Sequence, residues 1–166
     1  MIKQLFAITF ILALSIIAAI VITKRFVING TNSLPHYIYT THNIKIKRND
    51  YVYVCLNNNK AVLAQKLNIL SRGNYIRCPI TPLIKQIKGI PGDFIVADGI
   101  NEIKVNNQSI KGSKPNLGSI LPYFKTERYL KEDEYLIFTP HPDSFDSRYL
   151  GPISDKEIIQ ILKPIF

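Results

Sequence analysis

The chain has 166 residues, of which 21 are basic and 12 acidic, and its formal charge is +9. This length suits one domain of ordinary size with a short additional segment. The positive charge suits an anionic partner such as lipid headgroups, while the lack of a helix-turn-helix, zinc-finger or RNA-binding motif argues against nucleic acid. Neither cysteine stands in a metal-ligand spacing, and we expect neither a metal site nor a cofactor.

The amino-terminal segment carries a long apolar run. Residues 5–22, LFAITFILALSIIAAIVI, contain no charged side chain, and as a helix they would rise about 27 Å, close to the hydrocarbon thickness of a bilayer. A cleaved secretory signal would have a shorter apolar core followed by a small-x-small site. We therefore expect a retained single-pass membrane anchor over residues 1–25. The charges that flank this segment do not decide its orientation.

Residues 26–166 are predicted to form one mainly-β domain. The segment 59–73, NKAVLAQKLNILSRG, has alanine and leucine at helical spacing, and we expect a helix there that ends at Gly73. Residues 93–110 are expected to form a hairpin, and residues 111–128 a loop. The expected strands alternate in polarity or are rich in branched and aromatic residues, and they cover residues 37–42, 50–56, 83–89, 93–98, 101–107, 134–140 and 158–163.

Ser33, in the segment TNSLP, is the candidate nucleophile. It lies 11 residues beyond Ile22, the end of the apolar run, so its hydroxyl is expected near the membrane surface. A serine hydroxyl is a poor nucleophile at neutral pH and needs an adjacent base. Without such a base, Ser33 is an ordinary turn residue before Pro35.

Lys85, in the segment LIKQIKGIPGD, is the candidate base. Strand alternation places it on the same face as Leu83 and Ile87. An apolar setting disfavours the ammonium form and can lower the pKa of a lysine by several units. The alternative is a lysine whose stem covers a strand edge while its amine reaches solvent.

The segment PHPDSFDSRYLGP, residues 140–152, offers a second candidate base and an ion pair. His141 with Asp143 could complete a Ser-His-Asp arrangement. Asp146 and Arg148 form an acid-base pair near Ser144, either as a purely structural pair in a loop or as a brace for an active-site wall.

These segments together resemble the type I signal peptidases, the serine/lysine proteases that trim exported proteins at the membrane. LIKQIKGIPGD resembles their lysine box, SFDSRYLG their carboxy-terminal box and TNSLP their serine box, and the order of the boxes is also theirs. The chain is similar in particular to the conjugative-transfer, TraF-type branch, with its N-x-T-x-S-x-P pattern at residues 29–35. The branch also has a cysteine in the second strand and a Cys-Pro before the lysine box, which match Cys55 and Cys78. Tyr37 departs from the branch, which usually has glycine there.

The resemblance implies a signal-peptidase-like β domain and a role for each matching residue. Ser33 would be the nucleophile and Lys85 the general base, held by Ser144. The Ser33 backbone N–H and the Thr31 hydroxyl would form the oxyanion hole. The residues that would brace the site are Asp146 and Arg148.

The resemblance also implies a substrate and a compartment. The substrate would be a membrane-associated precursor, in particular a conjugative pilin subunit that is cleaved or cyclised. The domain would lie on the periplasmic or outer face of the bacterial inner membrane, where a Cys55–Cys78 disulfide is favoured over two buried thiols. The alternatives are a housekeeping signal peptidase, a self-cleaving repressor of the Ser/Lys type, and a non-catalytic component of a conjugation or secretion apparatus.

Overall fold

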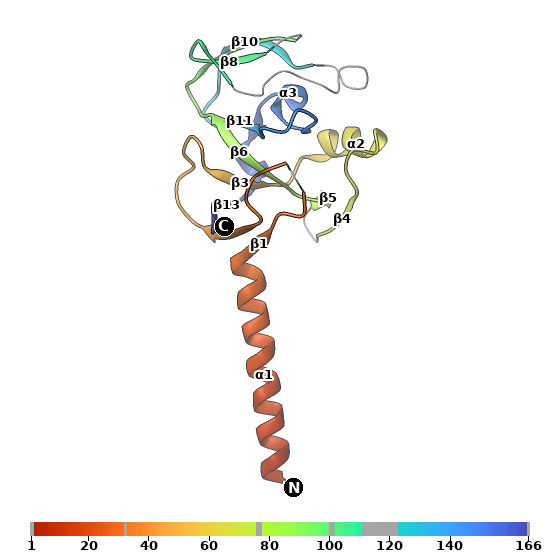
Figure 1. Ribbon diagram of the computed structural model, residues 1–166. Helices are drawn as coiled ribbons and strands as arrows, with labels where there is room; N and C mark the ends of the chain where they lie inside the picture. The colour runs from red at the N-terminus through yellow and green to blue at the C-terminus, as the bar shows by residue number, and fades with distance from the viewer. Residues whose placement is uncertain (1, 32, 76–77, 100–101, 111–122, 166) are drawn as a thin grey trace.

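A long amino-terminal helix projects from a mainly-β body in the computed structural model (Figure 1). The structure describes residues 2–31, 33–75, 78–99, 102–110 and 123–165. Helix α1, Ile2–Arg25, has 24 residues and leads directly into the first strand. No helix within these described ranges combines the length and the hydropathy of a membrane span. The carboxy terminus returns to the same end of the body, close to the exit of α1 (Figure 1).

The body is built on a seven-stranded antiparallel sheet. In spatial order its strands are β1 (Phe26–Ile28), β2 (Ile38–His42), β13 (Ile158–Pro164), β3 (Tyr51–Val54), β6 (Leu83–Gly89), β11 (Glu134–Phe138) and β12 (Ile153–Ser154). Strand β6 is therefore an interior strand, paired with β3 on one side and β11 on the other.

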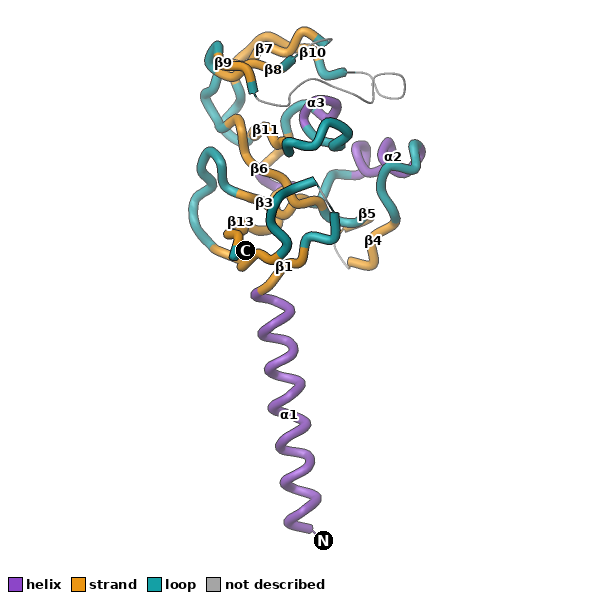
Figure 2. The backbone as a smooth tube through the Cα atoms, viewed as in Figure 1, coloured by secondary structure: helices purple, strands orange, loops and turns teal. Residues whose placement is uncertain are grey.

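Two smaller sheets complete the domain. A four-stranded sheet has the order β10 (Lys125–Tyr129), β7 (Phe94–Asp98), β8 (Ile103–Val105) and β9 (Gln108–Ser109). It lies at the end of the domain that is remote from α1 (Figure 2). A hairpin of β4 (Arg72–Tyr75) and β5 (Cys78–Ile80) flanks the main sheet, and Cys78 forms a disulfide with Cys55, just past β3. The other helical segments are α2 (Asn58–Lys66), α3 (Ser147–Leu150) and the short 3₁₀ segment Asp155–Glu157.

The prediction of a mainly-β domain is confirmed, with two corrections. The expected helix over 59–73 ends at Lys66, because Asn68 adopts a φ of 52° and the chain then enters β4, in which Gly73 lies. The expected loop over 111–128 contains the start of β10, which pairs with β7. Residues 111–122 lie outside the described residues.

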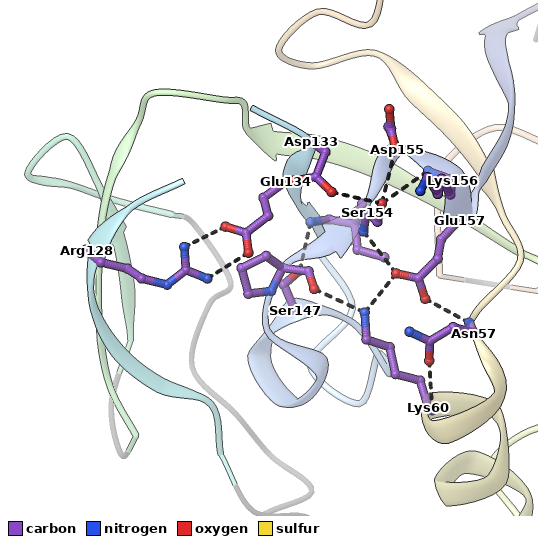
Figure 3. A network of polar contacts seen from close by, with 12 residues as sticks. Asn57, Lys60, Arg128, Asp133, Glu134, Ser147, Ser154, Asp155, Lys156 and Glu157 are labelled. Atoms are coloured by element: carbon purple, nitrogen blue, oxygen red, sulfur yellow. Dashed lines mark hydrogen bonds and ion pairs between the residues drawn. The ribbon is translucent and has the colours of Figure 1, made fainter. Parts of the chain in front are cut away.

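Helix α2 is tied to the carboxy-terminal part of the chain by a buried carboxylate, Glu157 (Figure 3). Glu157 accepts hydrogen bonds from the Lys60 ammonium at 2.9 Å, the Asn57 backbone N–H at 2.8 Å and the Ser154 backbone N–H at 2.9 Å. The Asn57 side chain caps α2. Since Ile69 and Leu70 follow α2 and line the cavity described below, this network helps to hold one wall of that cavity.

Candidate active site

Lys85 is a buried lysine in the middle of strand β6. Only 4% of the residue is exposed, and its backbone partner in β3 is Val52, a core residue with 0% exposure. Ile87 follows on the same face of the strand, also fully buried, as the alternation along 83–89 predicts. Strands cover both edges of β6, and the loop that carries Ser144 covers the end of the Lys85 side chain on the face of the sheet.

Burial changes the acid–base behaviour of this amine. The loss of solvation lowers the pKa of Lys85 from 10.5 to about 8; the charge of Asp146 opposes this shift and the charge of Arg148 adds to it. A lysine with a pKa near 8 is partly neutral at physiological pH, so its nitrogen can accept a proton.

The Lys85 ammonium has a fixed partner in Ser144. Its Nζ donates a hydrogen bond of 2.6 Å to the Ser144 Oγ, and Ser144 is itself only 5% exposed. The loop that carries Ser144 follows β11 and turns back through a hydrogen bond from the Ser144 N–H to the His141 carbonyl. The amine is thus held in one direction by a group that belongs to another part of the chain.

Asp146 and Arg148 form a fully buried, two-pronged ion pair behind Ser144. The Arg148 Nε lies 2.8 Å from the Asp146 Oδ1, and the Nη2 lies 2.7 Å from the Oδ2. The same guanidinium donates to the carbonyls of His141 and Pro142 at 2.8 and 2.9 Å, and the carboxylate accepts from the Thr139 N–H. The pair therefore fixes the path of the loop that presents Ser144.

Ser33 lies in the loop between β1 and β2. Buried Leu34 packs in a small core with Tyr39, Ile84 and Leu162, and so anchors this loop to the sheet. The Ser33 Oγ is 2.7 Å from the Thr31 Oγ1. Within the described chain, no hydrogen bond joins Ser33 to Lys85: the Ser33 hydroxyl is bonded to Thr31 and the Lys85 amine to Ser144.

One cavity of about 450 Å³ nevertheless brings these groups together. Its polar lining includes Thr31, Ser33, Lys85 and Ser144. Its apolar lining is Ile28, Tyr53, Ile69, Leu70, Pro82, Leu83, Ile84 and Phe145. A segment of extended peptide that entered this cavity would meet a hydroxyl, an amine of lowered pKa and a largely apolar wall.

A family model described as signal peptidase, peptidase S26, matches residues 1–166 of this chain. The chain belongs to this family. Two proteins that the S26 chain is similar to are the plasmid transfer protein TraF of Escherichia coli and the conjugal transfer protein TraF of Agrobacterium fabrum. The first is 24% identical over 145 residues, which cover 83% of this chain and 81% of that protein. The second is 25% identical over 153 residues, which cover 84% and 81%.

A solved structure similar to this S26 chain is a signal peptidase I from Enterococcus faecalis. The TM-score is 0.44 and the sequence identity 16%, over 74% of this chain and all of the other.

His141 and Asp143 also line the cavity of the S26 chain, but their arrangement does not suit a histidine base. In a Ser-His-Asp triad the Nδ1–H of the histidine donates to the carboxylate, which leaves Nε2 free to accept a proton. Here the His141 Nδ1 accepts the Asp143 backbone N–H at 3.2 Å, so in the neutral ring the proton lies on Nε2. This hydrogen bond is therefore not the one that a triad histidine makes.

The buried residue Asn29 has a position in the site that its motif alone does not explain. It is 6% exposed, and its side chain contacts both Thr31 and the carbonyl of His36. The N-x-T-x-S spacing marks it in the sequence, although nothing in that spacing indicates what its amide contacts.

As for metal ions, no group of three or more His, Cys, Asp or Glu side chains gathers among the residues that the structure describes.

Proposed function

We propose that this S26 chain is a membrane-bound serine endopeptidase with a Ser33/Lys85 dyad. The observation that carries the proposal is the buried Lys85 amine, with a pKa of about 8, on the wall of the cavity that also contains the Ser33 hydroxyl. A buried lysine without a function would more easily be replaced by an apolar residue, because desolvation of the charge is costly.

In the proposed reaction, neutral Lys85 removes the hydroxyl proton of Ser33 as the oxygen attacks the scissile carbonyl. Ser33 must first turn from its hydrogen bond with Thr31 toward the amine. The Ser33 backbone N–H stabilises the oxyanion, and the Lys85 ammonium then gives the proton to the departing amine. Water, deprotonated by the same lysine, hydrolyses the acyl-enzyme and restores Ser33.

The supporting residues act through Lys85. Ser144 keeps the amine directed into the cavity, and the Asp146–Arg148 pair keeps Ser144 in place. An amine in place of water, such as the amino terminus of the cleaved subunit, would give a cyclic product by the same route.

The substrate in this proposal is the leader of an exported precursor, in particular a conjugative pilin subunit. The similarity to proteins named for plasmid and conjugal transfer supports that substrate. We further propose that α1 anchors the chain in the inner membrane, with the domain on the periplasmic or outer face. The uncharged run of residues 5–22 and the exposed apolar side chains of α1, such as Phe6 at 72% and Phe10 at 66%, support an apolar environment around this helix.

The test is cleavage of the pilin precursor of the same mating system, coexpressed with the full chain. Ser33→Ala and Lys85→Ala are expected to abolish cleavage, whereas His141→Ala retains it. Lys88→Ala is the matched control, since Lys88 lies three residues further along β6 and binds Asn49 outside the cavity. If the Ser33→Ala variant still cleaves the precursor, the chain has a non-catalytic assembly role. If cleavage is lost in His141→Ala but not in Lys85→Ala, the Ser-His-Asp triad is favoured.

The orientation and the anchor have their own tests. Accessibility of the domain to protease added from the outer face tests the orientation, and resistance of the chain to alkaline extraction from membranes tests the anchor.

A further inference from the structure

The loop that carries Ser33 is organised by the amide of Asn29. The Asn29 Nδ2 donates to the His36 carbonyl at 3.2 Å, and its backbone N–H donates to the Tyr37 carbonyl at 2.8 Å. Its Oδ1 accepts two hydrogen bonds from Thr31, one from the backbone N–H at 3.1 Å and one from the hydroxyl at 2.9 Å. The Thr31 N–H can only donate, so the amide oxygen, and not the nitrogen, must face Thr31.

The donor and the acceptor in the hydrogen bond between the Thr31 and Ser33 hydroxyls can therefore be assigned. Thr31 has one hydroxyl proton, and that proton lies on the hydrogen bond to Asn29. The contact of 2.7 Å between Thr31 and Ser33 needs a proton as well, so Ser33 is its donor. In this geometry the nucleophile directs its proton toward Thr31 and away from Lys85. The Thr31 hydroxyl is not free to donate to a substrate oxygen, which differs from the place in the oxyanion hole that the resemblance implies for it.

We propose that Asn29 is a positioning residue that fixes the Thr31 hydroxyl as the acceptor for Ser33, and so holds the nucleophile in one resting orientation at the cavity mouth. This inference rests on the proposed function. Substrate binding then has to exchange the Ser33–Thr31 hydrogen bond for one between Ser33 and Lys85. Asn29 acts through Thr31, and among the described side chains no hydrogen bond joins its amide to Lys85.

The test uses the full chain in detergent micelles and a quenched fluorescent peptide with alanine at the first and third positions before the cut. Asn29→Ala is expected to lower kcat about tenfold with little change in KM, because the Ser33 oxygen then samples several positions in the cavity instead of the single one from which only its proton has to rotate toward Lys85. Thr31→Val should lower kcat at least as far, whereas Thr31→Ser should not. In the Thr31→Val background, Asn29→Ala should then add less than about a twofold further loss.

Asn29→Asp separates the two roles of the amide. It keeps an oxygen that accepts from Thr31 but removes the N–H that donates to His36. If Asn29 acts by orienting Thr31, Asn29→Asp retains kcat within about threefold of the unchanged chain when each is measured at the plateau of its pH profile. If Asn29 only closes the loop, the aspartate is as damaging as alanine, and the losses from Asn29→Ala and Thr31→Val multiply. Either of those results overturns the inference.

Failure of this inference can be distinguished from failure of the proposed function. Ser33→Ala that still cleaves the peptide would overturn the proposed function, whatever the Asn29 variants do. Ser33→Ala that is inactive, with multiplicative losses at Asn29 and Thr31, would overturn only the role of Asn29. Should Asn29→Ala not fold, as judged by circular dichroism, the comparison of Asn29→Asp with Thr31→Val and Thr31→Ser still decides the question.

Discussion

The Lys85 amine donates a hydrogen bond of 2.6 Å to the Ser144 hydroxyl, and both groups are almost completely buried. A lysine side chain has four rotatable bonds, so a buried amine without a partner would sample several directions. The hydroxyl of Ser144 both satisfies one N–H of the amine and limits its position. This pairing connects the strand that carries the base to the loop that Arg148 holds in place.

Replacement of Ser144 by alanine is expected to lower kcat about 10- to 100-fold and to leave KM nearly unchanged, because the base loses its orientation while the cavity keeps its shape. Steady-state cleavage of the fluorescent peptide measures both constants. Ser109→Ala, at an exposed position in the remote strand β9, is the control and should behave like the unchanged chain. An unaltered kcat in Ser144→Ala would show that the hydroxyl has no part in holding the base.

The pH dependence of cleavage should follow the protonation of Lys85. Burial lowers the pKa of this amine to about 8, and only the neutral form accepts the Ser33 proton. The value of kcat/KM is therefore expected to rise with pH, to reach half its maximum near the pKa of Lys85, and to fall about tenfold for each pH unit below it. A profile that is flat from about pH 6 to 9, or a limb that vanishes in His141→Ala, would exclude Lys85 as the titrating base.

The sequence predicts that Lys85 lies on the same strand face as Leu83 and Ile87, because the alternation of side chains along a strand is a local property. The meeting of Ser33 with Lys85 is not predictable from spacing. Strand β1, which leads into Ser33, and β6 are separated in the sheet by β2, β13 and β3. The residues alone leave Lys85 and His141 both open as the base for Ser33, and only the resemblance to a family favours Lys85. The direction of the Thr31 hydroxyl depends on how the loop folds around Asn29, which no residue pattern encodes.

The misplaced end of helix α2 has a similar cause. Leu67 and Leu70 continue the helical spacing, so the sequence predicts helix as far as Gly73. In the structure Leu67, Ile69 and Leu70 still pack against the main core, but from a turn after Lys66 rather than from a helix. Burial of the same side chains is thus achieved with a different backbone, since pairing of β4 with β5 overrides the local preference.

Arg148→Lys is expected to lower the free energy of unfolding by about 2–4 kcal/mol, although the charge is kept. A lysine cannot make the two parallel bonds to Asp146 and also reach the carbonyls of His141 and Pro142. Urea unfolding followed by circular dichroism gives the value. The control is Arg128→Lys, in a partly exposed pair with Glu134 (Figure 3), where the loss should stay below about 1 kcal/mol. Equal losses at the two positions would contradict a special role for the buried pair.

The disulfide between Cys55 and Cys78 should stabilise the domain measurably. It closes a segment with a sequence separation of 23, and a loop of that size restricts the unfolded chain by about 3 kcal/mol. Reduction is therefore expected to lower the Tm by about 10 °C for a domain of this length. The same bond joins the β4–β5 hairpin to the end of β3, next to Thr81 and Pro82 in the cavity wall. Reduction of the disulfide should therefore also lower the cleavage activity. The double variant Cys55→Ser, Cys78→Ser should unfold at the temperature of the reduced chain and show no response to reductant. A Tm that reductant does not change in the unaltered chain would mean that the bond contributes nothing to stability, and the hairpin would then have to be held by its packing against α2 and the core alone.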